Sequence, residues 1–302
     1  MPISRLDGLS GVLNCVFIVL LSLAVFYQDP FISVNAETAM TPIEKQQDTA
    51  RSDCRADLPL PDGIEDFVTF SETCLTDPDI GMTMLDGDVL VMFHRLNELR
   101  QRNGLSPFKW HAGAAKAAKL HAVDMLRRGY FDHLSPEGLS SRDRLQRLDR
   151  DEVFGLSGEN LAYYSNSWPD AYANNLLQHQ LENSPPHLEN MLNPEYTHAG
   201  AAIVKHGYTY MAVQVFLTSE GQLFADWPTT LSPGDRLTLP PQLGDRSVGG
   251  WRLVDEDGEV LNKAYDRIVT VPDDVHGATE LVVLGTESAR GYLLLNGPAA
   301  DL

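Results

Sequence analysis

The sequence predicts an α+β protein, with a mixed helix-and-strand domain followed by a small all-β domain. Two patterns lead to this prediction. Segments before residue 130 repeat their apolar residues with helical spacing, whereas the chain after His198 consists of β-branched and aromatic runs separated by turn residues. At 302 residues the chain is long enough to bury such cores without a metal or disulfide scaffold.

The N-terminal segment, residues 1–36, has the layout of a secretory signal. An apolar run of sixteen residues, Gly11 to Phe26, follows Arg5 and precedes Gln28-Asp29-Pro30, with Val34 and Ala36 at the −3 and −1 positions of a cleavage site. We therefore expect a secreted or periplasmic protein. The alternative is an uncleaved anchor that holds the protein on the membrane, facing outside, so this segment provides the only expected membrane contact.

The charge balance excludes one class of partner. There are 42 acidic residues against 23 Lys and Arg, which gives a formal net charge of −19. Because a nucleic-acid-binding protein needs a basic surface to neutralise phosphates, we expect no nucleic acid partner.

The next segment, residues 37–85, is polar and acidic and shows no sustained period, so we interpret it as a linker. It contains Cys54 and Cys74, which in an exported chain are expected to form one disulfide that closes a small loop. The alternative is two free thiols in a chain that stays inside the cell.

Helices are predicted over Asp86 to Asn103, ending before Gly104, and over Ala112 to Arg128, ending at Gly129. Two Ser-x-x-acid patterns predict further helix starts, at Ser140 and at Ser167.

Strands follow. The runs 198–204 and 208–217 are predicted to form a hairpin across Lys205-His206-Gly207. Residues 227–302 consist of short alternating stretches, which predict the small all-β domain. Within it, Asp255 to Gly258 lacks the spacing of a calcium loop, so we interpret it as a turn between two strands.

The chemistry-bearing candidates are polar residues predicted to lie between the helices. The sequence has no GxSxG, HExxH or phosphate-binding glycine loop. Two histidines and a carboxylate are a ligand set that zinc accepts, although their spacing along the chain does not by itself define a site. The candidates are His133, Glu159, Glu182, Ser184 and His187. The remaining helix-region histidines are interpreted as structural or surface residues, namely His94, His111, His121 and His179.

Three segments of the middle region carry a resemblance. LNELRQRNGLSPFKWHAGAAKAAKLHAVDMLRRGYFDHLSPEG is followed by GENLAYY and by SPPHLENMLNPEYTHAGAAIV. In order and spacing they resemble the CAP superfamily of cysteine-rich secretory, antigen 5 and pathogenesis-related proteins, also called SCP-like, in its bacterial branch. The resemblance covers about Leu90 to Phe216 and implies a CAP domain over 86–226, built as an α-β-α sandwich with a central antiparallel sheet and a cleft.

The family's cleft holds two histidines and two acids that can bind a divalent cation such as zinc. By resemblance, His133 and His187 are the two histidines and the expected metal ligands, and Glu159 is the first acid. Where eukaryotic members have a Trp and the second acid, this chain has Leu181 and Ser184. Glu182 is therefore the neighbouring carboxylate that could join. Asn97 and Arg100 match the family's first-helix Asn-x-x-Arg, for which we expect a packing and hydrogen-bonding role.

Two functional hypotheses follow from this resemblance. The first is an exported binding protein whose cleft, with or without a metal, binds a lipid, a cell-envelope component or a protein partner. The second is a metal-dependent hydrolase of peptidase or esterase type, in which His133 and His187 hold a cation and Glu159 acts as the base. We favour binding over catalysis because no covalent nucleophile is evident and the acidic half of the tetrad is incomplete.

Overall fold

The computed structural model describes residues 54, 58–77, 80–165, 173–288 and 291–302, all within one compact unit, Ala39–Leu302. Six helices are described: α1 Ile64–Thr76, α2 Asp86–Arg102, α3 Ala112–Arg128, α4 Ser141–Leu148, α5 Ala173–Glu182 and α6 Pro185–Leu192. None of these described helices is long and apolar enough to span a membrane. The predicted signal segment 1–36 and the helix start predicted at Ser167 lie outside the described residues.

The predicted helices form where the sequence places their ends. α2 is followed by Gly104 with a φ of 73°, and α3 ends at Gly129 with a φ of 69°, a left-handed conformation that glycine adopts without a Cβ clash. Ser140 and Asp143 form a complete capping box at the start of α4. These helices therefore begin and end at positions set by local chemistry.

Twelve strands are described in this part of the chain. They are β1 Thr83–Met84, β2 Lys109–Trp110, β3 Glu152–Ser165, β4 His198–His206, β5 Thr209–Gln222, β6 Arg236–Thr238, β7 Gln242–Leu243, β8 Arg246–Asp255, β9 Val260–Ala264, β10 Ile268–Thr270, β11 Ala278–Ser288 and β12 Gly291–Asp301. The main sheet has the order β1-β4-β5-β3-β12-β11-β8-β7, with β2 beside β4 and β9 beside β8, while β6 and β10 form a separate pair. The predicted hairpin is β4 and β5, which pair from His206 opposite Thr209.

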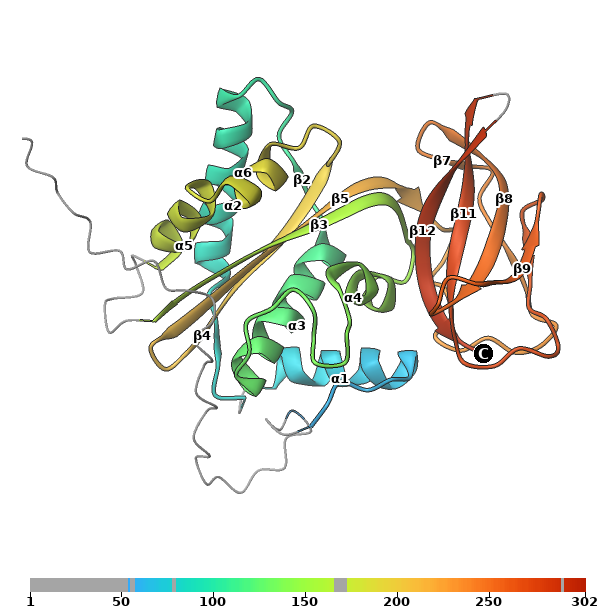
Figure 1. The fold of residues 1–302 in the computed structure, drawn as a ribbon, viewed down its shortest axis with the longest axis horizontal. Coiled ribbons are helices and arrows are strands. Elements are labelled where there is room, and N and C mark those ends of the chain that lie inside the picture. The colour runs from blue at the N-terminus through green and yellow to red at the C-terminus, as the bar shows by residue number, and fades with distance from the viewer. Residues whose placement is uncertain (1–53, 55–57, 78–79, 166–172, 289–290) are drawn as a thin grey trace, which may run out of the picture. The chain divides into compact units, whose positions relative to one another are not determined.

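Helices cover both faces of the β1-β4-β5-β3 part of the sheet, as Figure 1 shows. Ala199, Ala201 and Ile203 pack on one face with α2, α5 and α6, whereas Ala202 and Val204 pack on the other with α3 and α4. This alternation follows from the two-residue period of a strand that is buried on both sides. The result is the predicted α-β-α sandwich with a central antiparallel sheet.

The C-terminal strands have a separate core, built around Trp251 and including Val153 from β3. β12 joins the sheet beside β3 through the pair Asn296 and Phe154. Arg150 stabilises this junction, because its guanidinium donates to the carbonyl oxygens of Trp227, Pro228 and Ala299 at 3.0, 2.8 and 2.6 Å. The sheet thus continues past residue 227. The domain boundaries proposed from the sequence stay predictions.

The predicted disulfide between Cys54 and Cys74 is confirmed, with Cα atoms 5.3 Å apart. The surrounding segment, interpreted from the sequence as a linker, nevertheless contains helix α1. Helix α1 buries Ile64, Phe67, Ser71 and Cys74, a helical repeat in which a serine and a cysteine take positions normally occupied by aliphatic residues. An inspection of aliphatic and aromatic residues alone misses that face.

Two further findings concern strands. The long strand β3, which was not predicted from the sequence, lies between β5 and β12 in the main sheet and contains the Gly-Glu-Asn motif. The turn predicted at Asp255–Gly258 is confirmed. Gly258 has a φ of 80°, and the Asp255 carboxylate accepts the backbone N–H groups of Asp257 and Glu259 at 3.1 and 2.8 Å.

Candidate functional site

Glu159 is the central residue of the candidate cleft. It lies on β3 with only 3% of its side chain exposed. The two carboxylate oxygens have different partners: Oε1 accepts from His133 Nδ1 at 2.9 Å, and Oε2 accepts from Arg144 Nη2 at 2.8 Å. The structure therefore brings His133 and Glu159 together, although 26 residues separate them in the sequence.

The charge of Glu159 is compensated. Burial raises the pKa of this carboxyl, but the hydrogen bond from His133 and the charge of Arg144 outweigh burial, so the pKa is lowered overall. The same hydrogen bond raises the pKa of His133. Glu159 is consequently an ionised acceptor that fixes the proton of His133 on Nδ1 and leaves Nε2 on the other side of the ring.

Behind Glu159 lies a second histidine, His121 of α3, which is fully buried. Its Nε2 is 2.9 Å from the carbonyl oxygen of Asp132 and 3.8 Å from Glu159 Oε1. Burial lowers the pKa of His121 to about 4, so the ring is neutral at physiological pH. Its structural interpretation is confirmed, since its contact with Asp132 fixes the loop that carries His133.

His187 contributes the second imidazole from α6. Burial, together with the charge of His133, lowers the pKa of His187. Its Nδ1 is buried and has no hydrogen-bond partner, and its backbone oxygen accepts from Asn160 Nδ2 at 3.0 Å. Because Asn160 follows Glu159 on β3, one strand contacts both His133 and the backbone of His187.

Glu182 and Ser184 are not brought to His133 by any described contact. The Glu182 carboxylate forms a two-bond ion pair with Arg95 of α2, at 2.9 and 2.8 Å. Ser184 is the N-cap residue of α6, but its side chain makes no capping hydrogen bond.

A chain of buried amides nevertheless connects Glu182 to the backbone of His187. Gln178 donates to Glu182 at 3.0 Å, Gln214 donates to Gln178 at 2.9 Å, and Asn160 donates to Gln214 at 3.2 Å. Asn160 then donates to the His187 carbonyl. Glu182 thus helps to hold α6 in place through this chain of hydrogen bonds.

The first-helix pair has the structural role that was expected. Asn97 exchanges two hydrogen bonds with the backbone of Phe108, at 3.0 and 2.7 Å. Arg100, with 1% exposure, donates to the carbonyl oxygens of Ser106, Met191 and Asn193. These contacts hold α2 against the segments that flank α6.

The donor atoms allow a limited test of metal binding. Both carboxylate oxygens of Glu159 already accept hydrogen bonds, from His133 and Arg144. The imidazoles of His133 and His187 therefore remain as the candidate ligands of a cation. Among the described residues no group of three or more His, Cys, Asp or Glu is arranged to hold a metal ion. The unpartnered Nδ1 of His187 and the orientation of His133 by a carboxylate fit a site of two histidines, completed by water or by groups of a ligand.

Sequence reasoning missed Arg144, the residue that balances Glu159. The one local signal is the position of Arg144 in a short capped helix, on the face that also carries the apolar Leu145 and Leu148. All three side chains are buried. The amides Gln178 and Gln214 were missed as well, since a polar residue in a helix or strand gives no sign of burial until its partners are known.

The domain is an α-β-α sandwich in which His133 contacts the buried Glu159 of β3. Residues 93–217 match the family model described as the cysteine-rich secretory protein family, CAP, so this chain contains a CAP domain.

Two relatives and a solved structure resemble part of this chain. The uncharacterized membrane protein YlbC of Bacillus subtilis (strain 168) is 34% identical over 113 residues, which is 37% of this chain and 30% of that protein. The uncharacterized protein YkwD of the same organism is 33% identical over 115 residues, 37% of this chain and 40% of the other. An extracellular protein containing a SCP domain from Bacillus anthracis str. Ames is 28% identical with a TM-score of 0.37, over 44% of this chain and 40% of that one. The similarity thus spans less than half of each protein.

Proposed function

We propose that this protein is an exported binding protein whose CAP cleft binds its ligand through His133 and His187. The observation that carries the proposal is the environment of Glu159, whose two oxygens are taken by His133 and Arg144 inside the protein. A carboxylate held in this way fixes the geometry of an imidazole and is not exposed to react.

The same geometry favours binding over hydrolysis. A general base must reach the proton that it removes and gains from a pKa near the working pH. Glu159 is buried, and its pKa is lowered from the ordinary value of 4.5. His133, by contrast, has 56% of its side chain exposed. The imidazoles are therefore the groups that meet a ligand.

A divalent cation such as zinc is a fitting partner for these two rings, and would supply a positive centre for an anionic or carbonyl group of the ligand. We propose as ligand a lipid, a cell-envelope component or a protein partner. The export of the chain, with or without cleavage of the segment 1–36, belongs to the same proposal.

A zinc titration tests the site. Addition of zinc at about a hundredfold excess over its Kd is expected to stabilise the full chain by about 2.7 kcal/mol, measured by thermal unfolding. The double variant His133→Ala and His187→Ala should lose this effect. The matched control His94→Ala and His276→Ala removes two other histidines and should keep it. The absence of any zinc effect in the parent protein would remove the metal from the proposal.

Turnover assays separate binding from catalysis. We expect that zinc-loaded protein does not cleave peptides, esters or cell-wall fragments. Metal-dependent cleavage that disappears in the Glu159→Gln variant, while folding is kept, would overturn the binding proposal in favour of the hydrolase.

A further inference from the structure

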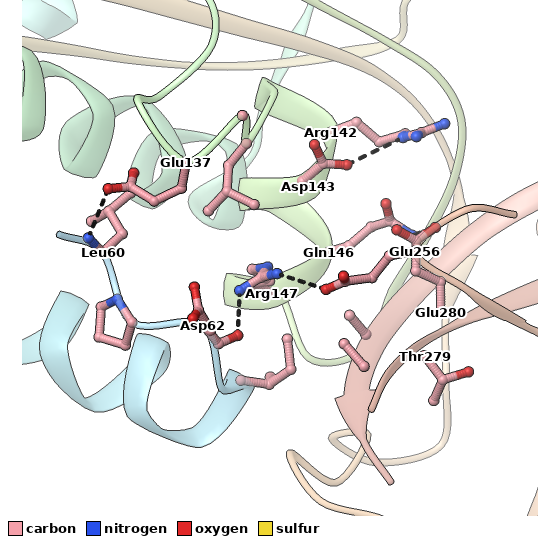
Figure 2. Close-up of a pocket in the computed structure, with 16 residues that line it drawn as sticks. Leu60, Asp62, Glu137, Arg142, Asp143, Gln146, Arg147, Glu256, Thr279 and Glu280 are labelled. Carbon is pink, nitrogen blue, oxygen red and sulfur yellow. Dashed lines mark hydrogen bonds and ion pairs between the residues drawn. The ribbon is translucent and has the colours of Figure 1, made fainter. Parts of the chain in front are cut away.

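A pocket lies between the chain before α1, helix α4 and the C-terminal strands, and neither His133 nor His187 lines it. Its volume is about 560 Å³, within the range of small-molecule sites in proteins. Figure 2 shows its side chains, which come from three separate parts of the sequence: Leu60 to Ile64, the segment 137–147, and residues of the C-terminal strands such as Thr279 and Glu280.

Gln146 of α4 is the most informative residue of this pocket. The side chain is 1% exposed, and its Nε2 donates to the carbonyl oxygen of Gly297 at 2.9 Å and to Glu280 Oε2 at 3.3 Å. Its Oε1 has no hydrogen-bond partner although it is buried. An unsatisfied buried amide oxygen is costly, and in a pocket it indicates a position where a ligand donor belongs.

Carboxylates add further acceptors around Gln146. Among the described residues, Gln146 is the one donor to the Glu280 carboxylate, at 3.3 Å, and burial raises the pKa of this carboxyl. Glu256, on the β8–β9 turn, has 71% of its side chain exposed and can change its position easily. These acidic groups make the pocket unsuitable for an anion.

Two guanidinium groups supply the donors. Arg147 is 10% exposed and is fixed by a 2.9 Å bond from Nη1 to the carbonyl oxygen of Asp62, while its Nη2 is 3.8 Å from Glu256, too far for a hydrogen bond. Figure 2 shows Arg147 between these two residues. Arg142, half-exposed, lies 3.7 Å from Asp143.

We propose that this pocket is a binding site for a small, non-anionic saccharide. Each hydroxyl group donates one hydrogen bond and accepts others, so neighbouring hydroxyls can satisfy Gln146 Oε1 and the carboxylates while accepting from Arg147 and Arg142. The apolar wall of Leu60, Ile64 and Leu139 provides contact for the ring carbons. This site is independent of the CAP cleft, and its occupancy does not depend on His133 or His187.

The direct test uses defined sugars on the full chain. Glucose, N-acetylglucosamine, glucosamine and cellobiose are each added at millimolar concentration and followed by saturation-transfer NMR, with affinities measured by calorimetry. Acetate and trialanine serve as the anionic and peptide probes. We expect at least one sugar to bind and neither comparison probe to do so.

Variants then place the binding in this pocket. Glu280→Gln, which keeps the size of the side chain, and Arg142→Ala should each weaken sugar binding at least about fivefold, as the loss of one hydrogen bond predicts. Glu256→Ala should weaken it less, and its neighbour Glu259→Ala, which is outside the pocket lining, should have no effect. Arg102→Ala is the matched arginine control, and thermal unfolding of each variant verifies its fold.

The results decide between the alternatives. Binding of no sugar in the panel, or sugar binding that these variants leave unchanged, overturns the proposal. Binding of acetate or trialanine that Arg142→Ala abolishes overturns the assignment to saccharides. Loss of the zinc effect in the cleft, with sugar binding retained, would affect the proposed function alone.

Discussion

Two pairs of a histidine and a buried glutamate differ in their surroundings: His133 with Glu159, and His111 with Glu152. In the cleft, Glu159 binds His133 at 2.9 Å and has Arg144 at 2.8 Å on its other oxygen. At the start of β3, Glu152 Oε2 is 3.3 Å from His111 Nε2, while its Oε1 is buried without a hydrogen-bond partner.

Around His111 the next neighbour is another carboxylate. Asp149 Oδ2 lies 3.7 Å from His111 Nδ1, and burial and the charge of Glu152 raise the pKa of Asp149 against the effect of His111. Burial lowers the pKa of His111, but Glu152 and the nearby aspartates outweigh burial and raise it overall. Arg144 therefore balances the negative charge of Glu159 beside His133. Beside His111 there are two carboxylates, and their charge is balanced only when His111 or Asp149 binds a proton.

His111 also has a structural task that His133 lacks. It is the N-cap residue of α3, where its Nδ1 accepts the backbone N–H of Ala114 at 3.1 Å. Nε2 therefore carries the proton that is directed at Glu152. If Nδ1 were also protonated, it could no longer accept the Ala114 N–H and would face Asp149 instead. The start of α3 is therefore sensitive to pH.

The largest effect is expected for Arg144→Met, which removes the charge that balances Glu159. Because an ionised carboxylate is then left buried with only His133, we expect a loss of about 3–5 kcal/mol in the free energy of unfolding, measured with urea. The variant should also loosen the loop of His133, since Arg144 donates to the carbonyl oxygens of His133 and Leu139.

Two controls sharpen this prediction. The double variant Arg144→Met and Glu159→Gln should recover part of the loss, because it removes both charges. Glu152→Gln, in the uncompensated pair, should change stability by less than about 1 kcal/mol. Equal losses in the single and double variants would show that the shape of Arg144 matters and its charge does not.

A medium effect is expected for Gly113→Ala in the second position of α3. A Cβ at Gly113 would lie 1.6 Å from Asp149 Oδ2, so Asp149 must move away from His111. We expect a loss of about 1–3 kcal/mol in thermal or urea unfolding.

Gly87 is the matched control, since it is the second residue of α2 and an added Cβ there meets nothing within 4 Å. Gly87→Ala should stabilise by up to about 1 kcal/mol. A similar loss in both variants would refute the steric explanation.

The smallest effect is a pH dependence from His111. Because its pKa in the folded protein is raised above the ordinary value of 6.5, protonated His111 stabilises the folded state. This contribution is complete below about pH 6.5 and is lost as the pH rises through the raised pKa.

The free energy of unfolding, measured by urea titration at successive pH values, should therefore fall more steeply above pH 6.5 in the parent than in His111→Asn. Asparagine keeps an N-cap acceptor but does not titrate, so the variant isolates the proton. Identical pH profiles would show that the carboxylates around His111 do not hold its proton.

The success of sequence reasoning depended on how local the signal was. The capping box at Ser140 and the glycines at 104 and 129 are signals within a few residues, and the structure places helix ends there. Helix α1 was missed because Ser71 and Cys74 are part of its buried face. Strand β3 was missed because its motif was recognised as a family signature and not as a strand.

The sequence by itself determined the ends of α2 and α3, the start of α4, the β4–β5 hairpin, the C-terminal strands and the pairing of Cys54 with Cys74. Each follows from neighbouring residues or, for the disulfide, from the two cysteines that come after the predicted signal segment. The tertiary structure decided which charges meet. Arg144 and Glu159 are 15 residues apart, and Gln146 and Gly297 are 151 apart. Whether a buried polar group is satisfied depends on such distant partners, because the energy of a buried charge is set by what surrounds it and not by its position in the chain.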